Sequence, residues 1–209
     1  MAPVPLWLKF GWTAWVALWA PTYALHHGPE NFLWFCDLAN FAIAAGLWLE
    51  SPLLLSWQAV SVLVVQILYL VDVAGRYVLG FFPIGATMFI FDEKVPLQIR
   101  LVSLFLHAVT PPILLWGVKR LGYDRRALGV QVAAAAAILA ISYLGGPDRD
   151  INWSHGPFGK PQTVVAPGLY LLVAVVGYTI LLYLPAHLFL SRVWPRNSPG
   201  TAPRPPEPP

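Results

Sequence analysis

Charged residues are scarce in this sequence. Only 11% of the 209 residues are Asp, Glu, Lys or Arg, whereas a typical soluble domain contains about 25%. Together with 57% hydrophobic residues, this composition excludes a disordered chain and argues against a soluble domain. Six helical crossings of a membrane would use about 120 residues, at about 20 per crossing. The sequence therefore predicts an integral membrane protein without a large domain outside the membrane.

Cysteine and the common enzyme motifs are also nearly absent. The single Cys36 has no second cysteine with which to form an intramolecular disulfide. The sequence has no phosphate-binding glycine loop, no Cys-x-x-Cys pair, no His-Glu-x-x-His motif and no nucleophile-elbow serine, which argues against the common soluble enzyme classes. The net charge of +3 is small and scattered, so we expect no nucleic-acid partner. We also predict no cofactor.

Six apolar runs are each long enough to cross a hydrocarbon core of about 30 Å. They are residues 6–25, 31–50, 53–71, 97–117, 127–145 and 168–190. Segment 75–92 is apolar but contains Arg76, Gly80 and Pro83, so we predict a re-entrant or interfacial segment there. The expected fold is all-α: a polytopic membrane bundle of about six helices. It forms one domain over residues 1–195, followed by a disordered proline-rich tail over residues 196–209.

An even number of spans places both termini on the same side of the membrane. The side with the termini would hold Lys9, Lys119, Arg120, Arg125, Arg126, Arg192, Arg196 and Arg204, and the opposite side Arg76, Lys94, Arg100, Arg149 and Lys160. The positive-inside rule therefore predicts cytoplasmic termini. Residues 6–25 also fit a signal peptide, but bulky Trp12, Trp15 and Trp19 favour a retained helix.

Polar side chains form a stripe on four of the predicted spans. Cys36, Asp37 and Asn40 fall within an arc of about 100° at 3.6 residues per turn. The other stripes are Gln58, Gln66, Tyr69 and the terminal Asp72; Arg100, Ser103, His107 and Thr110; and Thr179, Tyr183 and His187. An Asp facing lipid costs about 2.5–3.5 kcal/mol, so we expect the four stripes to face one another.

Two interpretations of these stripes stay open. Hydrogen bonds between membrane helices account for the Gln and Thr positions, and Asp72 is expected to be solvated at the membrane surface. Asp37 and His107 are ionisable groups within spans, which typically mark functional sites. Asp37 requires a partner, for which His107 or Arg100 is the expected choice. A structural pair and a catalytic or proton-handling pair fit the sequence equally well.

The predicted outer loops contain two further patterns. His26, His27, Glu30 and His155 are residue types that bind metals, but their spacing matches no zinc signature. We therefore predict no metal site. Asn152-Trp153-Ser154 fits the sequon for N-glycosylation, a pattern so short that it often occurs by chance.

Three stretches of the sequence carry a resemblance to a known family: NFLWFCDLANFAIAAGLWLESPLL, FLHAVTPPILLWGVKRLGYDRRALG, and DINWSHGPFGKPQ with LYLLVAVVGYTILLYLP. They resemble YwaF-like bacterial integral membrane proteins, which implies a bacterial cytoplasmic membrane. That family is similar to a eukaryotic transmembrane acyltransferase and, distantly, to androgen-induced membrane hydrolases of lipid esters. The resemblance implies Cys36 as the acyl-carrying nucleophile or its remnant, His107 as general base and Asp37 beside them. Two positions before the Cys–Asp pair, the family has a histidine and this sequence has Trp34.

The first functional hypothesis is a membrane lipid esterase or acyltransferase with catalytic residues His107, Asp37 and Cys36. Its expected substrate-binding residues are Asn40, Gln66, Tyr69, Arg100, Ser103 and Thr110. Cys36 and His107 differ in predicted depth by about 7 Å, which argues against direct contact. The alternative is a non-catalytic protein that binds or transports a small ligand, relays protons or serves as a structural subunit. Membrane lipids are the expected partners, and the sequence names no protein partner.

Overall fold

The regular structure is helical throughout the part of the chain that the structure describes. This structure, a computed structural model, describes residues 3–195, so the predicted tail lies outside the described residues. Its helices are α1 (Leu6–His27), α2 (Phe35–Trp48), α3 (Pro52–Leu79), α4 (Leu97–Leu121), α5 (Ala127–Leu144), and a continuous last helix made of α6 (Pro167–Tyr178), the π-helical η5 (Thr179–Tyr183) and α7 (Leu184–Val193). Short 3₁₀ segments are η1 (Pro29–Leu33), η2 (Met88–Phe91), η3 (Ile151–Trp153) and η4 (Pro157–Gly159). The predicted all-α fold with six helices is confirmed.

Four of the six helices are long and apolar enough to cross a membrane. They are α3, α4, α5 and the last helix, Pro167–Val193. Helix α2 is apolar but has only 14 residues, or about 21 Å at 1.5 Å per residue, which is less than the hydrocarbon thickness. An integral membrane protein is thus supported by four candidate spans, and the other two predicted crossings stay predictions.

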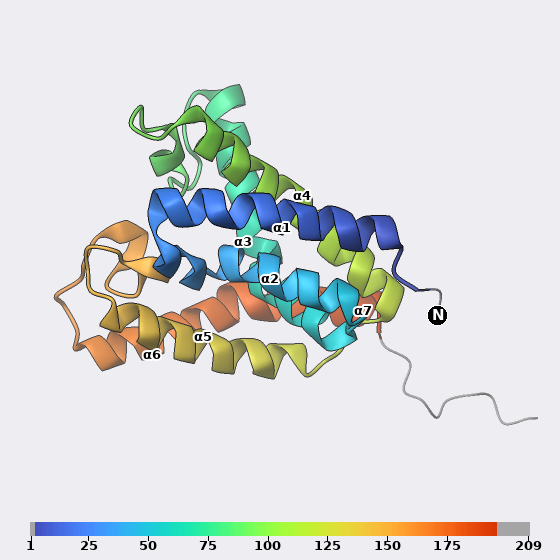
Figure 1. Cartoon of the computed structure of the whole chain (residues 1–209). Helices are drawn as coiled ribbons and strands as arrows, with labels where there is room; N and C mark the ends of the chain where they lie inside the picture. The colour runs from blue at the N-terminus through green and yellow to red at the C-terminus, as the bar shows by residue number, and fades with distance from the viewer. Residues whose placement is uncertain (1–2, 196–209) are drawn as a thin grey trace, which may run out of the picture.

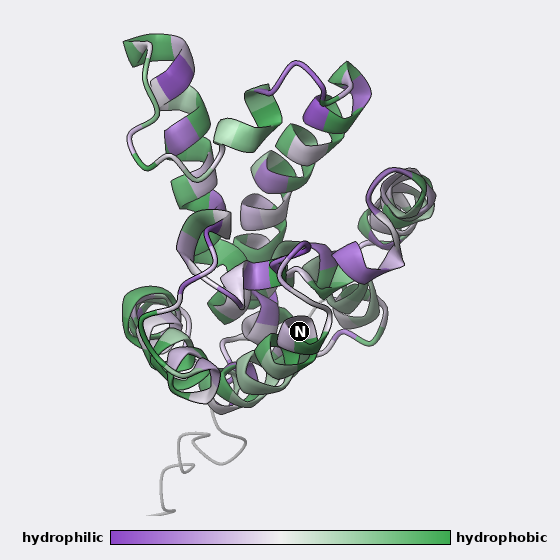
Figure 2. Ribbon diagram, turned by 90° about the vertical axis from the view of Figure 1, so that its left-hand side faces the viewer, coloured by the Kyte–Doolittle hydropathy of each residue, from purple (hydrophilic) through white to green (hydrophobic). Residues whose placement is uncertain are grey.

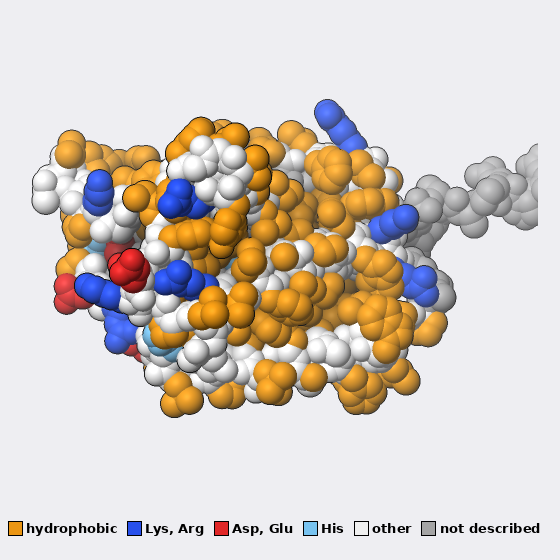
Figure 3. Space-filling model, turned by 90° about the horizontal axis from the view of Figure 1, so that it is seen from above, with side chains coloured by type: hydrophobic (Ala, Val, Ile, Leu, Met, Phe, Trp, Pro, Cys, Tyr) orange, Lys and Arg blue, Asp and Glu red, His pale blue; other side chains and the backbone are white. Residues whose placement is uncertain are grey.

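The connecting segments gather at two ends of the bundle (Figure 1). At the N-terminal end, Val4 N and Lys9 Nζ both donate to Glu50, and Tyr123 N donates to Trp194 O. At the opposite end, Arg149 donates to the carbonyl of His27. Apolar side chains cover much of the surface between these ends (Figure 3), as expected for a lipid-facing belt.

Helix α3 lies at the centre and contacts α2, α4, α5 and the last helix. Its Leu55 is fully buried and lies against Gly46 of α2 and Gly117 of α4. A Cβ atom at either glycine would come within 2.7 Å of a Leu55 methyl group. Small residues at such points let membrane helices approach closely, so these two glycines allow α2 and α4 to pack against α3.

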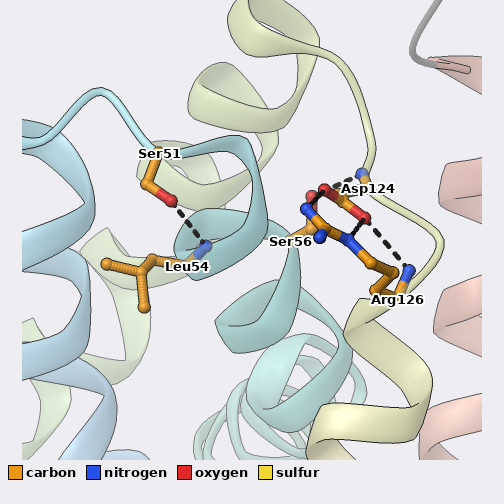
Figure 4. Close-up of polar contacts among 5 residues, drawn as sticks. All are labelled: Ser51, Leu54, Ser56, Asp124 and Arg126. Carbon is orange, nitrogen blue, oxygen red and sulfur yellow. Dashed lines mark hydrogen bonds and ion pairs between the residues drawn. The ribbon is translucent and has the colours of Figure 1, made fainter. Parts of the chain in front are cut away.

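Polar contacts attach the 122–126 turn to the start of α3 (Figure 4). Ser51 Oγ accepts a hydrogen bond from Leu54 N and caps α3. One turn later, Ser56 Oγ accepts from Asp124 N. The carboxylate of Asp124 in turn accepts from the backbone and guanidinium of Arg126, and these bonds raise the pKa of Arg126. The turn between α4 and α5 is therefore positioned by α3.

The segment between α3 and α4 differs from the prediction. Arg76 lies within α3, which continues to Leu79 and ends where Gly80 adopts a φ of 79°. The end of α3 and the start of α4 extend away from α5 and the last helix (Figures 1 and 2). Arg100 donates to the carbonyls of Asp92 and Val95 in this connection, so it stabilises the turn before α4.

Asp72 holds the 80–96 connection against α3. Its carboxylate accepts hydrogen bonds of 2.7–3.0 Å from the backbone N–H groups of Ile84, Gly85 and Thr87 and from the Thr87 hydroxyl. Asp72 is 0% exposed, so the expectation that it is solvated is wrong. The connection folds back over the carboxylate because four donors within it compensate for lost hydration.

We predict that Asp72→Ala releases the 80–96 connection and lowers the free energy of unfolding by about 2–4 kcal/mol, because buried N–H groups lose their acceptor. Thermal unfolding in detergent measures the loss, and hydrogen exchange at residues 84–87 localises it. Asp92→Ala is the control, because Asp92 accepts one exposed bond from Lys94 N. Unchanged exchange at 84–87 in Asp72→Ala would contradict this role.

Candidate functional site

Asp37 lies buried in the first turn of α2 and is 5% exposed. Its Oδ2 accepts a hydrogen bond of 2.5 Å from Asn31 Nδ2. Gly28, with a φ of 86°, turns the chain from α1 into η1 and brings Asn31 to the start of α2. The hydrogen-bond partner recorded for this carboxyl is thus a neutral amide six residues away, rather than the expected His107 or Arg100.

His107 belongs to a cluster between α3 and α4. Its Nδ1 lies 2.7 Å from the carbonyl of Ser103, and its ring stacks on Tyr69 at 3.7 Å with an interplanar angle of 9°. The Tyr69 hydroxyl and Ser103 Oγ are 3.1 Å apart. The two-proline step at 111–112 lies within α4, which stays one continuous helix. His107, Tyr69 and Ser103 therefore constrain one another.

Tyr23 joins this cluster from α1. The Tyr23 hydroxyl lies beside Ser103 and within electrostatic reach of Asp37, Tyr69 and Cys36. These groups come from all of the first four helices, so their side chains meet only after the bundle has formed. Sequence reasoning missed Tyr23 because a single tyrosine in a tryptophan-rich helix forms no periodic polar stripe.

Cys36 connects this region to a second row of polar groups. Its thiol lies beside Asp37 and the Gln66 amide, and the side chain packs near Trp19 and Leu106. Within residues 3–195, no recorded hydrogen bond joins Cys36 to His107. This agrees with the difference in predicted depth between the two side chains.

The second row continues through α3, α5 and the last helix. Gln66 is 0% exposed and neither amide atom has a hydrogen-bond partner. The Tyr183 hydroxyl, in π-helical η5, lies next to Gln131 and is also unpartnered, as is Gln131 Nε2. Gln131 Oε1 accepts a bond of 2.8 Å from Trp57 Nε1. Buried polar atoms normally have partners, so this row has unused hydrogen-bonding capacity.

The other predicted site residues have local roles. Asn40 accepts from Trp15 Nε1 through Oδ1 and from Trp12 Nε1 through its carbonyl, both at 3.0 Å, so it joins α1 to α2. Thr110 Oγ1 donates to the carbonyl of Leu106 in its own helix. Arg100 donates to backbone carbonyls in the connection before α4. Asn40 Nδ2 also donates to the carbonyls of Cys36 and Asp37, and the Gln66 amide lies beside the Cys36 thiol.

The 146–166 segment folds over the start of α2. Asn152 donates from Nδ2 to Leu33 O at 2.8 Å and accepts from Phe35 N at 3.1 Å. Its carbonyl accepts from the Tyr178 hydroxyl, and its φ of 53° suits asparagine. Asn152 is only 4% exposed. The glycosylation interpretation is therefore wrong, because both side-chain atoms are used inside the fold.

The histidines of this end pack on neighbouring rings: His26 lies against His27, with ring centroids 4.5 Å apart, and His27 lies against Tyr23. His155 stacks on Tyr143 at 4.4 Å, and its backbone N–H donates to Asp150. Burial raises the pKa of Asp150, and that backbone bond opposes the increase. Glu30 pairs with Arg149. Among the described residues, no group of three His, Cys, Asp or Glu side chains is placed to hold a metal ion.

Comparisons with known proteins assign no family to this chain. No family model, no curated protein and no solved structure matches it. The resemblance to YwaF-like proteins, with the roles it implies for Cys36, Asp37 and His107, therefore stays a prediction. The function has to be argued from the geometry of the polar groups themselves.

We predict that Asn152→Gly destabilises the protein by about 1–3 kcal/mol, because the start of α2 loses two hydrogen bonds. Glycine tolerates the positive φ, so the substitution adds no backbone strain, and its entropic cost in the unfolded chain is shared by a second glycine variant. Thermal unfolding in detergent is the measurement. Gln162→Gly is the control, since the Gln162 amide bonds only within its own exposed loop. Equal stability of the two variants would contradict the bridging role of Asn152.

Proposed function

We propose that this protein is a non-catalytic membrane protein that takes up and releases a proton at Asp37. One observation carries the proposal: a carboxyl group that is 5% exposed in an apolar bundle has a neutral amide, that of Asn31, as its recorded hydrogen-bond partner. A buried carboxylate is costly unless a cation or a proton neutralises it. Ionisable groups inside membranes commonly mark proton relays or ligand sites.

The row of polar groups beyond Asp37 supports proton transfer through the bundle. The Cys36 thiol lies beside the Gln66 amide, and the Tyr183 hydroxyl lies beside Gln131 and within electrostatic reach of Cys36. Gln66, Tyr183 and Gln131 each have buried polar atoms without a partner, so each can still donate or accept a hydrogen bond. Tyr183 lies in a π-helical segment, a distortion that is frequent at functional sites.

Acyl transfer has less support in this geometry. A cysteine nucleophile needs a base within hydrogen-bond reach of its thiol. His107 is held by the Ser103 carbonyl and stacked on Tyr69, and among the described residues no hydrogen bond joins it to Cys36. The lipid esterase or acyltransferase hypothesis therefore stays a prediction, and lipid-ester turnover lost in His107→Ala would support it.

Charge distribution supports the predicted orientation. The described N-terminal end carries six basic residues against two acidic ones, Glu50 and Asp124. The basic ones are Lys9, Lys119, Arg120, Arg125, Arg126 and Arg192. The opposite end carries five basic residues against five acidic ones, apart from Asp37 and Asp72 inside the fold. This excess favours a cytoplasmic N-terminal end, which would put Asp37 nearer the external face.

We predict that Asp37→Asn abolishes proton flux through the protein. The full chain is reconstituted into vesicles that enclose a pH-sensitive dye, and a potassium diffusion potential drives the flux. Wild type should acidify or alkalinise the lumen faster than protein-free vesicles, whereas Asp37→Asn should match them because asparagine carries no exchangeable acidic proton.

Two further variants complete the design. Asp150→Asn changes a carboxyl group in the 146–166 segment, outside the polar row, and should keep wild-type flux. Gln131→Leu removes the unpartnered amide and should slow the flux while Asp37 is intact. Flux in Asp37→Asn equal to wild type, or wild-type flux equal to that of empty vesicles, would refute the proposal.

A further inference from the structure

A cavity of about 310 Å³ lies at the end of the bundle opposite the N-terminus. It is half open to the outside and lies between η1, the end of α5 and the segment that leads into η3. Its lining residues are Glu30, Leu33, Ile141, Ser142, Gly145, Arg149 and Ile151. Its volume is at the lower end of the range for small-molecule sites. No role proposed above for Asp37 or the polar row uses this cavity.

The polar groups of the cavity are of three kinds. Arg149 pairs with Glu30 and also donates to the carbonyl of His27. The side chains of Arg149 and Glu30 are 48% and 35% exposed, so the pair is open to a ligand. Ser142 is 1% exposed, and its Oγ has no hydrogen-bond partner. A cation, an anion and an unused hydroxyl therefore converge on apolar walls.

The position of the cavity indicates the kind of ligand. Helix α5 is a candidate membrane span that ends at Leu144, so the cavity lies where the chain leaves the hydrocarbon core. Leu144 is 84% exposed beside it, and Ile141, which lines the cavity, is 53% exposed on the same helix. Lipid headgroups occupy this depth, and acyl chains extend from them along the spans.

We infer that this cavity binds the headgroup of a zwitterionic phospholipid. The phosphate is held by Arg149, whose guanidinium suits phosphate oxygens, and by the hydroxyl of Ser142. The ammonium group is held by Glu30. A half-exposed ion pair is weak. The Arg149–Glu30 pair therefore opens at low cost in free energy, and each side chain then binds the oppositely charged group of the ligand. The acyl chains follow the exposed face of α5.

The pairing of opposite charges sets the specificity. An anionic headgroup without an amine would place its negative charge near Glu30 without compensation, which disfavours it. A purely cationic ligand would leave Arg149 and Ser142 unused. Phosphatidylethanolamine satisfies all three groups, whereas phosphatidylglycerol satisfies two of them and is repelled by the third.

Native mass spectrometry of the full chain in detergent tests this inference. Phosphatidylethanolamine should remain bound at lower added concentration than phosphatidylglycerol. Soluble phosphoethanolamine at the same concentration should not displace it, because only the lipid makes the apolar contacts with α5. Equal retention of both lipids would overturn the zwitterionic specificity, and displacement by the soluble compound would overturn a lipid ligand.

Single substitutions assign the contacts. Arg149→Gln should weaken retention of phosphatidylethanolamine about tenfold, since bonds to charged groups are among the stronger ones. Glu30→Gln should remove the preference over phosphatidylglycerol. Ser142→Ala keeps the packing and should weaken retention by a smaller factor. Wild-type retention in both Arg149→Gln and Ser142→Ala would overturn the site.

Two controls separate this site from general effects. Lys160→Gln removes an exposed cation of the same segment that does not line the cavity and should leave retention unchanged. Asp37→Asn should also retain the lipid, so a failed proton-flux experiment does not decide the lipid site. A loss of retention in Lys160→Gln equal to that in Arg149→Gln would overturn the inference, since it indicates unspecific attraction to basic residues.

Discussion

Burial of α3 on several sides is the constraint on which the other helices depend. In its most apolar 18-residue window, 56% of the residues are buried, against 11% in the last helix. A central helix must offer a complementary surface to each neighbour. Leu55 does so against Gly46 and Gly117, where no larger residue fits without displacement. Because α2 and α4 approach α3 so closely, their polar side chains can form hydrogen bonds only with the few groups that lie beside them.

This close packing divides the buried polar groups into two sets. Asn40 and Asp72 have several hydrogen bonds each and join elements together. Gln66 and Tyr183 have buried polar atoms without partners, although burial of such atoms is costly. The first set accounts for stability. The second set, which adjoins Cys36 and Asp37, lowers stability. Residues that lower stability are better explained by a role in function than by a role in folding.

The five-residue segment η1 links the two proposed sites. Glu30 lines the cavity, Asn31 bonds the Asp37 carboxyl, and the carbonyl of Leu33 accepts from Asn152. A ligand that replaces the Glu30–Arg149 pair thus acts one residue from the partner of Asp37. Short segments that contact two sites are natural points of coupling, provided that they adopt two arrangements.

The sequence by itself determined the helices and their approximate ends, because apolar runs and polar stripes are periodic properties of neighbouring residues. It also identified several of the buried polar positions, including Asp37, Gln66 and Ser103. Only the tertiary structure decided their partners. Asn31 rather than His107 bonds Asp37, and Tyr23 joins the cluster from α1. Such pairings depend on how far each helix is rotated and on the path of each loop, which are set by packing around α3 and leave no periodic pattern in the sequence.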